Sequence, residues 1–356
     1  MKSAAAVILL GAALVLLGEL RGVSAPKPFA PHQSKGAWLA ASGTAPLDGP
    51  SALVLIERMK QLGADSIAVG PDVVQPHLDA PELEWGRDDD ALRFVLRAAR
   101  TFGLKTFVMP RVESPDFFKP PYPWRGTMTF ERPEVRAAWY ENYRRMIVHY
   151  GRLCAEEGVT TFGIGLEYRK LVTEDPKEWR RVAEAARGVF GGTLVYSANW
   201  DDYERIAWWD AVDVVGIGAY FEIIEDGLPD GKYVDTKTLK LPDLSDVMDG
   251  WKPIRAKLEA FSTSVARPIL FTEVGYTRYA DTCWYPWRWQ AVREERPEQQ
   301  ALAYRALMRT FAGAPWWAGV YVWRFYTRPE DMSDCRYRTT DRSEHVLRDA
   351  WSHHRR

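Results

Sequence analysis

The sequence predicts an eight-stranded parallel β/α barrel, a TIM barrel, formed by a single α/β domain. Beyond about residue 35, short apolar runs alternate with longer segments of helical periodicity. Counting gives eight strand and helix pairs, and eight βα units in one chain indicate a closed barrel. A doubly wound open sheet is the alternative, but residues 41–45 after the first strand lack the glycine-rich phosphate loop that this fold usually carries.

The predicted elements follow from local signals taken in chain order. Apolar runs predict strands over 36–40, 66–70, 105–110, 161–167, 193–198, 213–219, 268–273 and 319–323. Helical spacing predicts helices over 49–62, 88–102, 133–157, 175–190, 244–265 and 297–311, a short helix from Asp202 and a closing helix near the C-terminus. Pro133 and Pro176 stand at predicted helix starts, where a proline costs no hydrogen bond.

Composition excludes several classes of protein. The 356 residues carry 47 Lys+Arg and 48 Asp+Glu, a formal net charge of −1, so nothing attracts nucleic acid and no such partner is expected. With 46% apolar and 27% charged residues the chain is an ordinary globular protein, and three cysteines cannot build a disulfide scaffold. The excess lies in aromatic residues, which include 16 tryptophans.

The N-terminus has the pattern of an export signal. Lys2 precedes the uncharged run 3–18, and Val23-Ser24-Ala25 fits the small-residue cleavage pattern. Because Pro26 follows that site, an uncleaved membrane tether through residues 3–18 stays open as the alternative. Either reading places the folded part outside the cytoplasm. We therefore expect a signal or anchor over 1–25, a linker over 26–35 and a barrel domain over 36–356.

Two glutamates are the strongest candidates for chemistry. Glu167 ends the predicted fourth strand and Glu273 the seventh, and barrel enzymes carry their chemistry at the carboxyl ends of the strands. An acidic residue that closes an apolar strand costs free energy unless it is paired or functional. Two carboxyl groups that face one cavity suit glycoside hydrolysis, in which one protonates the leaving oxygen and the other attacks the anomeric carbon or orients water.

Aromatic residues at strand ends would provide stacking surfaces for a sugar. The candidates are Trp124, Trp200, Tyr220, Tyr276 and Trp323. The remaining assignments place Trp139, Trp179 and Trp351 in the core, and give each of the pairs Trp208-Trp209 and Trp316-Trp317 one packed ring and one ring toward solvent. No cofactor is expected, and the scattered histidines predict no metal site.

Several segments together resemble glycoside hydrolase family 113, which consists of bacterial β-mannanases. They are 124–126 (WRG), 194–200 (LVYSANW), 208–220 (WWDAVDVVGIGAY), 269–276 (ILFTEVGY) and 315–323 (PWWAGVYVW). The resemblance runs from about residue 36 to 325 and implies a retaining double displacement, with Glu167 as acid/base and Glu273 as nucleophile. It also implies that Arg125, Asn199 and Tyr220 contact the substrate and that Trp323 is the floor of the −1 subsite.

The chain departs from the family pattern near the proposed acid/base. Leu166 stands where the clan commonly has Asn, Tyr168 where the family usually shows Leu, and Arg111 where it has a histidine. Arg111 is included among the substrate-binding candidates because it could recognise an acidic sugar. The alternative is a salt bridge between Arg111 and Glu113.

The sequence therefore predicts a monomeric retaining glycoside hydrolase whose partner is a polysaccharide or oligosaccharide, β-mannan or a related β-1,4-linked glycan. A non-catalytic barrel that binds carbohydrate or cell-wall glycan is the alternative. Cys283 and Cys335 fall in late loops on the catalytic face, and in an oxidising compartment we expect them to form a disulfide.

Overall fold

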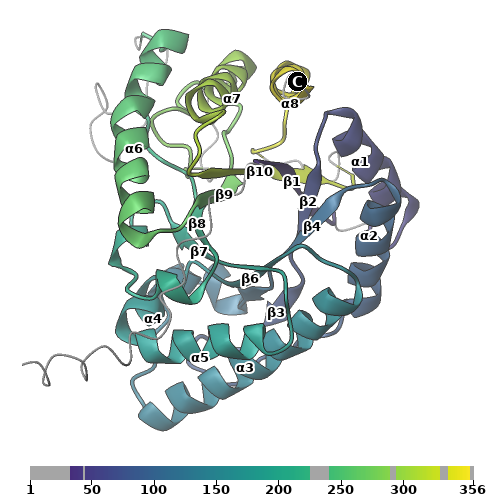
Figure 1. Ribbon diagram of the computed structural model, residues 1–356, viewed down its shortest axis with the longest axis vertical. Helices are drawn as coiled ribbons and strands as arrows, with labels where there is room; N and C mark the ends of the chain where they lie inside the picture. The colour runs from purple at the N-terminus through teal and green to yellow at the C-terminus, as the bar shows by residue number, and fades with distance from the viewer. Residues whose placement is uncertain (1–32, 43–44, 225–239, 289–293, 329–335, 353–356) are drawn as a thin grey trace, which may run out of the picture.

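A computed structural model describes residues 33–42, 45–224, 240–288, 294–328 and 336–352. Eight parallel strands close into a barrel in the ring order β1, β10, β9, β8, β7, β6, β4, β2. Figure 1 looks along this barrel and shows the helices outside the ring of strands. The predicted TIM barrel is confirmed.

The barrel strands match the predicted apolar runs, and the last one is longer than expected. They are β1 (Ser34–Ala40), β2 (Ser66–Val69), β4 (Lys105–Val108), β6 (Thr161–Leu166), β7 (Thr193–Asn199), β8 (Val214–Gly218), β9 (Ile269–Val274) and β10 (Trp317–Tyr326). β1 begins at Ser34, inside the segment predicted as a linker.

The helices form the outer layer. They are α1 (Pro50–Gln61), α2 (Asp89–Thr101), α3 (Pro133–Glu156), α4 (Arg169–Glu174), α5 (Pro176–Arg187), α6 (Leu244–Val265), α7 (Pro297–Phe311) and α8 (Asp341–Ser352). Four of them, α1, α3, α5 and α7, begin with a proline at the first helical position, as the sequence signals indicate. α6 instead begins at a capping side chain, since the Asp243 carboxylate accepts hydrogen bonds from the amides of Ser245 and Asp246.

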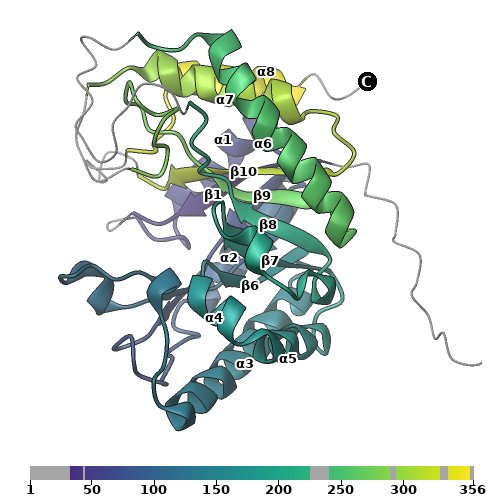
Figure 2. The same ribbon diagram turned by 90° about the vertical axis from the view of Figure 1, so that its left-hand side faces the viewer.

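A second, small sheet was not predicted. β3 (Asp72–Val74) and β5 (Arg111–Glu113) pair in parallel beside the barrel mouth. β5 opens the segment that leads from β4 to α3, which projects from one side of the barrel in Figure 2. This small sheet fixes the backbone of two charged residues, Asp72 and Arg111, near the carboxyl ends of the strands.

The interior of the barrel is filled by side chains from all eight barrel strands. This inner cluster comprises Trp38, Ala68, Phe107, Met109, Leu166, Val195, Val214, Leu270 and Tyr321, with Ala318 and Trp323 packed against it. Leu166 therefore belongs to the barrel core below the mouth, where it is 2% exposed.

Most tryptophans in the described part of the chain are buried. Trp139, Trp179 and Trp351 are buried, as expected. The prediction for the paired tryptophans is wrong, because Trp208, Trp209, Trp316 and Trp317 are all less than 5% exposed. Trp179 stacks on Trp208 with ring centroids 5.6 Å apart, and this contact joins α5 to the segment after β7. Among the described residues, no helix has the length and apolarity needed to cross a bilayer.

Candidate active site

The two candidate glutamates lie at the same end of the barrel. Glu167 directly follows β6, the fourth barrel strand, and Glu273 is the penultimate residue of β9, the seventh. All eight strands are parallel, so their carboxyl ends open on one face. Only β7 and β8 separate these two strands in the ring.

Gly218, at the end of β8, lies between the two side chains. It pairs with Glu273 in the register of β8 and β9. A Cβ atom built on Gly218 would be 3.9 Å from Oε1 of Glu167. The negative charge of Glu167 also contributes to raising the pKa of Glu273. The two carboxyl groups therefore face a common space above β8.

The backbone at Glu167 adopts an uncommon conformation that hydrogen bonds hold in place. Its φ is +58°, in the left-handed region that non-glycine residues rarely adopt. The Glu167 amide donates to the Ser197 carbonyl at 2.8 Å, and the Tyr168 amide donates to the Tyr196 hydroxyl at 2.9 Å. Backbone strain of this kind persists where the surrounding structure enforces it, and it clusters at functional sites.

Glu273 is more deeply buried, with 6% exposure. Its Oε2 accepts a hydrogen bond from the Tyr220 hydroxyl at 3.2 Å, while its buried Oε1 has no hydrogen-bond partner among the described residues. Burial, followed by the charge of Glu167, raises the pKa of Glu273 to about 8, whereas Arg111 and Arg125 act in the opposite direction. A perturbed carboxyl group with an unsatisfied oxygen indicates a functional site.

Arg125 joins Glu167 to a third carboxylate. Its Nη1 donates to Oε2 of Glu167 at 3.1 Å, and its Nη2 donates to Oε1 of Glu113 at 2.7 Å. Burial alone would lower the pKa of Arg125, but the charges of Glu113 and Glu167 outweigh it, so the pKa lies above its usual value. Arg125 thus provides a fixed positive charge beside both candidate catalytic carboxyl groups.

The alternative expectation for Arg111, a salt bridge to Glu113, is wrong. Its Nη2 donates to Oδ1 of Asp72 at 2.7 Å, and Glu113 is bound instead by Arg125. The two strands of the small sheet explain the difference, because the register of β3 and β5 places Asp72 opposite Arg111. The guanidinium carbon of Arg111 lies 5.8 Å from the ring centroid of Trp323.

Trp323 lies at the mouth, partly buried on β10. Its ring meets Trp38 edge-on with centroids 5.4 Å apart. The following residue, Arg324, places its guanidinium carbon 4.5 Å from the same ring. Trp323 is therefore held between the barrel core and two cationic side chains.

Asn199 and Trp200 follow at the end of β7, between the strands that carry the two glutamates. The backbone amide of Asn199 donates a hydrogen bond to Oδ1 of Asp202 at 2.9 Å. Trp200 packs against Phe221 with ring centroids 6.0 Å apart. Burial raises the pKa of Asp202 to about 6. Both Asn199 and Trp200 are half-buried at the mouth.

Two other candidates, Tyr276 and Trp124, form no hydrogen bond with either glutamate in the described part of the chain. Tyr276 is 0% exposed and packs edge-on against Tyr304 of α7, so its ring belongs to the helix layer. Trp124 is half-buried and covers Gly126, where an added Cβ atom would lie 2.3 Å from the Trp124 ring.

The predicted disulfide involves Cys335, which lies outside the described residues. Its proposed partner Cys283 is buried. The pairing stays a prediction.

Four further residues of the site were not among the sequence candidates: Asp72, Glu113, Arg324 and Tyr337. A signal existed for Glu113, which follows a predicted strand as a polar residue. No such signal marks Tyr337, whose ring lies 5.8 Å from that of Tyr220 and whose hydroxyl donates to the Pro286 carbonyl.

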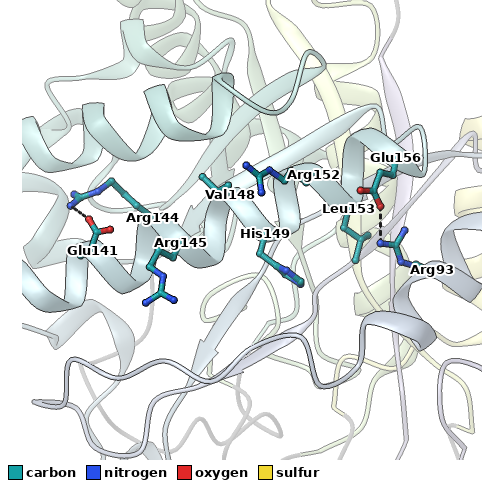
Figure 3. A pocket seen from close by; sticks show the side chains of 9 residues that line it. All are labelled: Arg93, Glu141, Arg144, Arg145, Val148, His149, Arg152, Leu153 and Glu156. Atoms are coloured by element: carbon teal, nitrogen blue, oxygen red, sulfur yellow. Dashed lines mark hydrogen bonds and ion pairs between the residues drawn. The ribbon is translucent and has the colours of Figure 1, made fainter.

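A separate hollow lies on the outside of the barrel. Figure 3 shows it along α3, with Arg93 contributed by α2. Arg93 pairs with Glu156 there, and Arg144 pairs with Glu141. This hollow contains neither candidate glutamate, so it is not part of the site at the mouth.

A parallel barrel with glutamates at the ends of its fourth and seventh strands defines a glycoside hydrolase of the TIM-barrel type. The model of Glycoside Hydrolase Family 113 matches residues 37–341, and the chain belongs to that family. The resemblance found in the sequence is confirmed.

Solved structures show the same fold. A family 113 β-mannanase from Alicyclobacillus acidocaldarius, in complex with ManMIm, has a TM-score of 0.76 at 21% identity, over 92% of this chain and 99% of that one. A family 113 β-1,4-mannanase has a TM-score of 0.73 at 18% identity, over 90% and 99%. A family 5 mannosidase from Rhizomucor miehei has a TM-score of 0.62 at 11% identity, over 90% and 92%. No curated protein matches the chain in sequence.

Proposed function

We propose that the protein is a retaining hydrolase of β-mannan or a related β-1,4-linked polysaccharide, with Glu167 as acid/base and Glu273 as nucleophile. The observation that carries this proposal is the convergence of the two carboxyl groups over Gly218. A retaining mechanism requires the two groups to be close, about 5 to 5.5 Å apart.

The reaction proceeds by two displacements. In the first, ionised Glu273 attacks the anomeric carbon while Glu167 gives its proton to the glycosidic oxygen, so the C–O bond breaks and a glycosyl ester forms. In the second, Glu167 removes a proton from water, and the water oxygen displaces the carboxylate of Glu273. Because only the ionised form of Glu273 attacks, and burial raises the pKa of Glu273 to about 8, kcat/KM should increase as the pH rises toward that value.

Neighbouring side chains assist each step. The Tyr220 hydroxyl, which donates to Glu273, orients the nucleophile. The fixed charge of Arg125 favours the ionised form of Glu273, and its Nη1 orients Glu167 through a hydrogen bond. Trp323 provides the stacking floor for the sugar at the point of cleavage, and Asn199 and Trp200 contact the substrate beside it.

The choice of mannan rests on similarity. The two family 113 structures cited above are those of β-mannanases. The net charge of −1 is also compatible with a neutral polymer, for which aromatic stacking serves better than long-range attraction.

Substitution of the two glutamates tests these roles. We expect Glu167→Ala and Glu273→Ala each to lower kcat on an aryl β-mannoside by about 10³-fold or more. Sodium azide should restore turnover with opposite products: a β-glycosyl azide from Glu167→Ala and an α-glycosyl azide from Glu273→Ala. The matched control is Glu134→Gln, an exposed carboxylate in the first turn of α3, which should retain activity.

Two results would contradict the proposal. Azide products of the reverse configuration would exchange the two roles. Binding of β-mannan by the wild type with no turnover would favour the non-catalytic barrel.

We also propose that the protein is exported through residues 1–25, which lie outside the described residues. N-terminal sequencing of the mature protein from the extracytoplasmic fraction tests this. A mature chain beginning at Pro26 supports cleavage, and an intact N-terminus in the membrane fraction supports a tether through residues 3–18. The expectation of a monomer stays a prediction, which light scattering would check.

A further inference from the structure

A cavity of about 370 Å³ opens at the carboxyl ends of β1, β2 and β10. Its lining includes Trp38, Gly70, Asp72, Arg111, Trp323 and Arg324. Trp323 belongs both to this cavity and to the sugar floor proposed above. Trp323 thus connects this cavity to the proposed site of cleavage.

The position of the cavity in the ring identifies which part of a substrate reaches it. The strand of Glu167, β6, lies on one side of β9, and β10, β1 and β2 lie on the other. The acid/base must reach the oxygen that links the cleaved sugar to its leaving group, so the leaving group lies toward β6. The cavity beyond Trp323 then receives the next sugar on the non-reducing side.

The cavity carries a positive charge that the described residues leave uncompensated. Arg324 is half-buried, and its Nε donates to the Tyr326 hydroxyl at 2.6 Å. Its guanidinium carbon lies 4.5 Å from the Trp323 ring and 4.6 Å from the Tyr326 ring. In the described part of the chain Arg324 contacts these aromatic groups and forms no ion pair.

The other charges of the cavity are already balanced or lie at its edge. Arg111 is neutralised by Asp72 at 2.7 Å. Asp88, which also borders the cavity, is exposed to solvent at the start of α2. The guanidinium of Arg324 is therefore the charge that a ligand in this cavity would meet.

We propose that this cavity binds the carboxylate of a uronic acid residue, placed immediately to the non-reducing side of the cleaved sugar. The guanidinium fork of Arg324 matches a carboxylate in two parallel hydrogen bonds, and such charge-assisted bonds are stronger where water is partly excluded. Trp323, which is only partly buried, supplies apolar ring surface for the sugar itself. The inference rests on the proposed function in taking Trp323 as the sugar floor.

The test uses two matched substrates. One is 4-nitrophenyl β-mannobioside, and the other has a mannuronic acid in place of its non-reducing mannose. We expect wild type to have at least a tenfold higher kcat/KM on the acidic substrate. Arg324→Gln should lower the ratio of the two kcat/KM values at least tenfold, and Arg324→Lys should lower it less, because a lysine keeps the charge without the fork. The control Arg145→Gln removes an arginine of the outer hollow in Figure 3 and should leave the ratio unchanged.

A binding measurement separates this inference from the proposed function. Calorimetry on Glu167→Gln protein compares mannobiose with its acidic counterpart without turnover. At least tenfold tighter binding of the acidic disaccharide, lost when Arg324→Gln is added, supports the cavity assignment even if no aryl mannoside is cleaved. Equal or weaker binding of the acidic disaccharide, or an unchanged preference with Arg324→Gln, would overturn it, even if the neutral substrate is hydrolysed.

Discussion

Glu273 is a residue whose position favours function over stability. Its Oε1 has no hydrogen-bond partner among the described residues, and its pKa is raised from 4.5 to about 8, chiefly by burial. Between pH 4.5 and about pH 8, Glu273 therefore keeps its proton in the native protein but loses it in the unfolded chain. The free energy of unfolding falls as the pH rises through this window.

We accordingly predict that Glu273→Gln is more stable than wild type. The gain should be small near pH 5 and should grow to on the order of 2 kcal/mol by about pH 8, because the amide carries no charge to desolvate. Urea unfolding at several pH values measures it, with Glu134→Gln as the exposed control. A gain that does not grow with pH would show that Glu273 is not held protonated by its surroundings.

Arg125, in contrast to Glu273, stabilises the folded protein, because it is a buried cation between two carboxylates. Arg125→Gln would leave Glu113 and Glu167 without their partner, and we predict a loss of about 3 kcal/mol in the free energy of unfolding. Removal of the positive charge also raises the pKa of Glu273, on which Arg125 acts. The acidic limb of the kcat/KM profile should therefore move to higher pH. An unshifted profile would limit Arg125 to a structural role.

Some residues of this site could be predicted from their local sequence, and others could not. Glu167 and Glu273 could be found because each ends an apolar strand, and the barrel rule places such ends together. The pairing of Arg111 with Asp72 could not, since it depends on the register of two three-residue strands. Side-chain direction also escaped prediction at Tyr276, which follows β9 yet points into the helix layer.

At the scale of elements, the aromatic layer under β6 and β7 determines where Glu167 lies. The Tyr196 hydroxyl accepts a hydrogen bond from the amide that follows Glu167, and the Tyr196 ring packs on Trp179 and Trp208. Tyr168, which departs from the family pattern, packs on Trp179 in the same layer. This departure therefore has a packing role.

Removal of the Tyr196 hydroxyl should lower kcat as well as the free energy of unfolding. Tyr196→Phe leaves the Tyr168 amide unpaired, at a cost of about 1–3 kcal/mol, and we predict a reduction of kcat of about tenfold or more as Glu167 moves. The matched control is Tyr143→Phe, which removes a buried hydrogen bond to the Ile164 carbonyl in the same layer. Equal losses of kcat in both variants would contradict a specific effect on Glu167.

The helices were predicted better than the short strands, for a physical reason. The predicted spans 244–265 and 297–311 coincide with α6 and α7, since periodic apolar spacing and terminal signals persist over many residues. β3 and β5 span three residues each and are specified by their partners across the sheet. The small sheet that positions Arg111 was missed for this reason.

At the scale of the whole molecule, the tryptophan excess divides unequally between core and site. Among the described residues most of these rings are buried, including both adjacent pairs, whereas others, among them Trp124, Trp200 and Trp323, remain partly exposed. Adjacent residues alternate sides only in a strand, and Trp208-Trp209 lies instead at the start of a 3₁₀ turn, where both rings reach the core. Composition alone could not distinguish these cases.

The configuration of the first product is the most direct test of a double displacement by Glu167 and Glu273. Proton NMR can follow hydrolysis of β-1,4-mannotetraose before the released sugars mutarotate. We predict that the new reducing end appears first as the β anomer, because two inversions at the anomeric carbon restore the original configuration. Initial appearance of the α anomer would contradict the mechanism, since it would mean a single displacement by water and a wider separation of the two carboxyl groups.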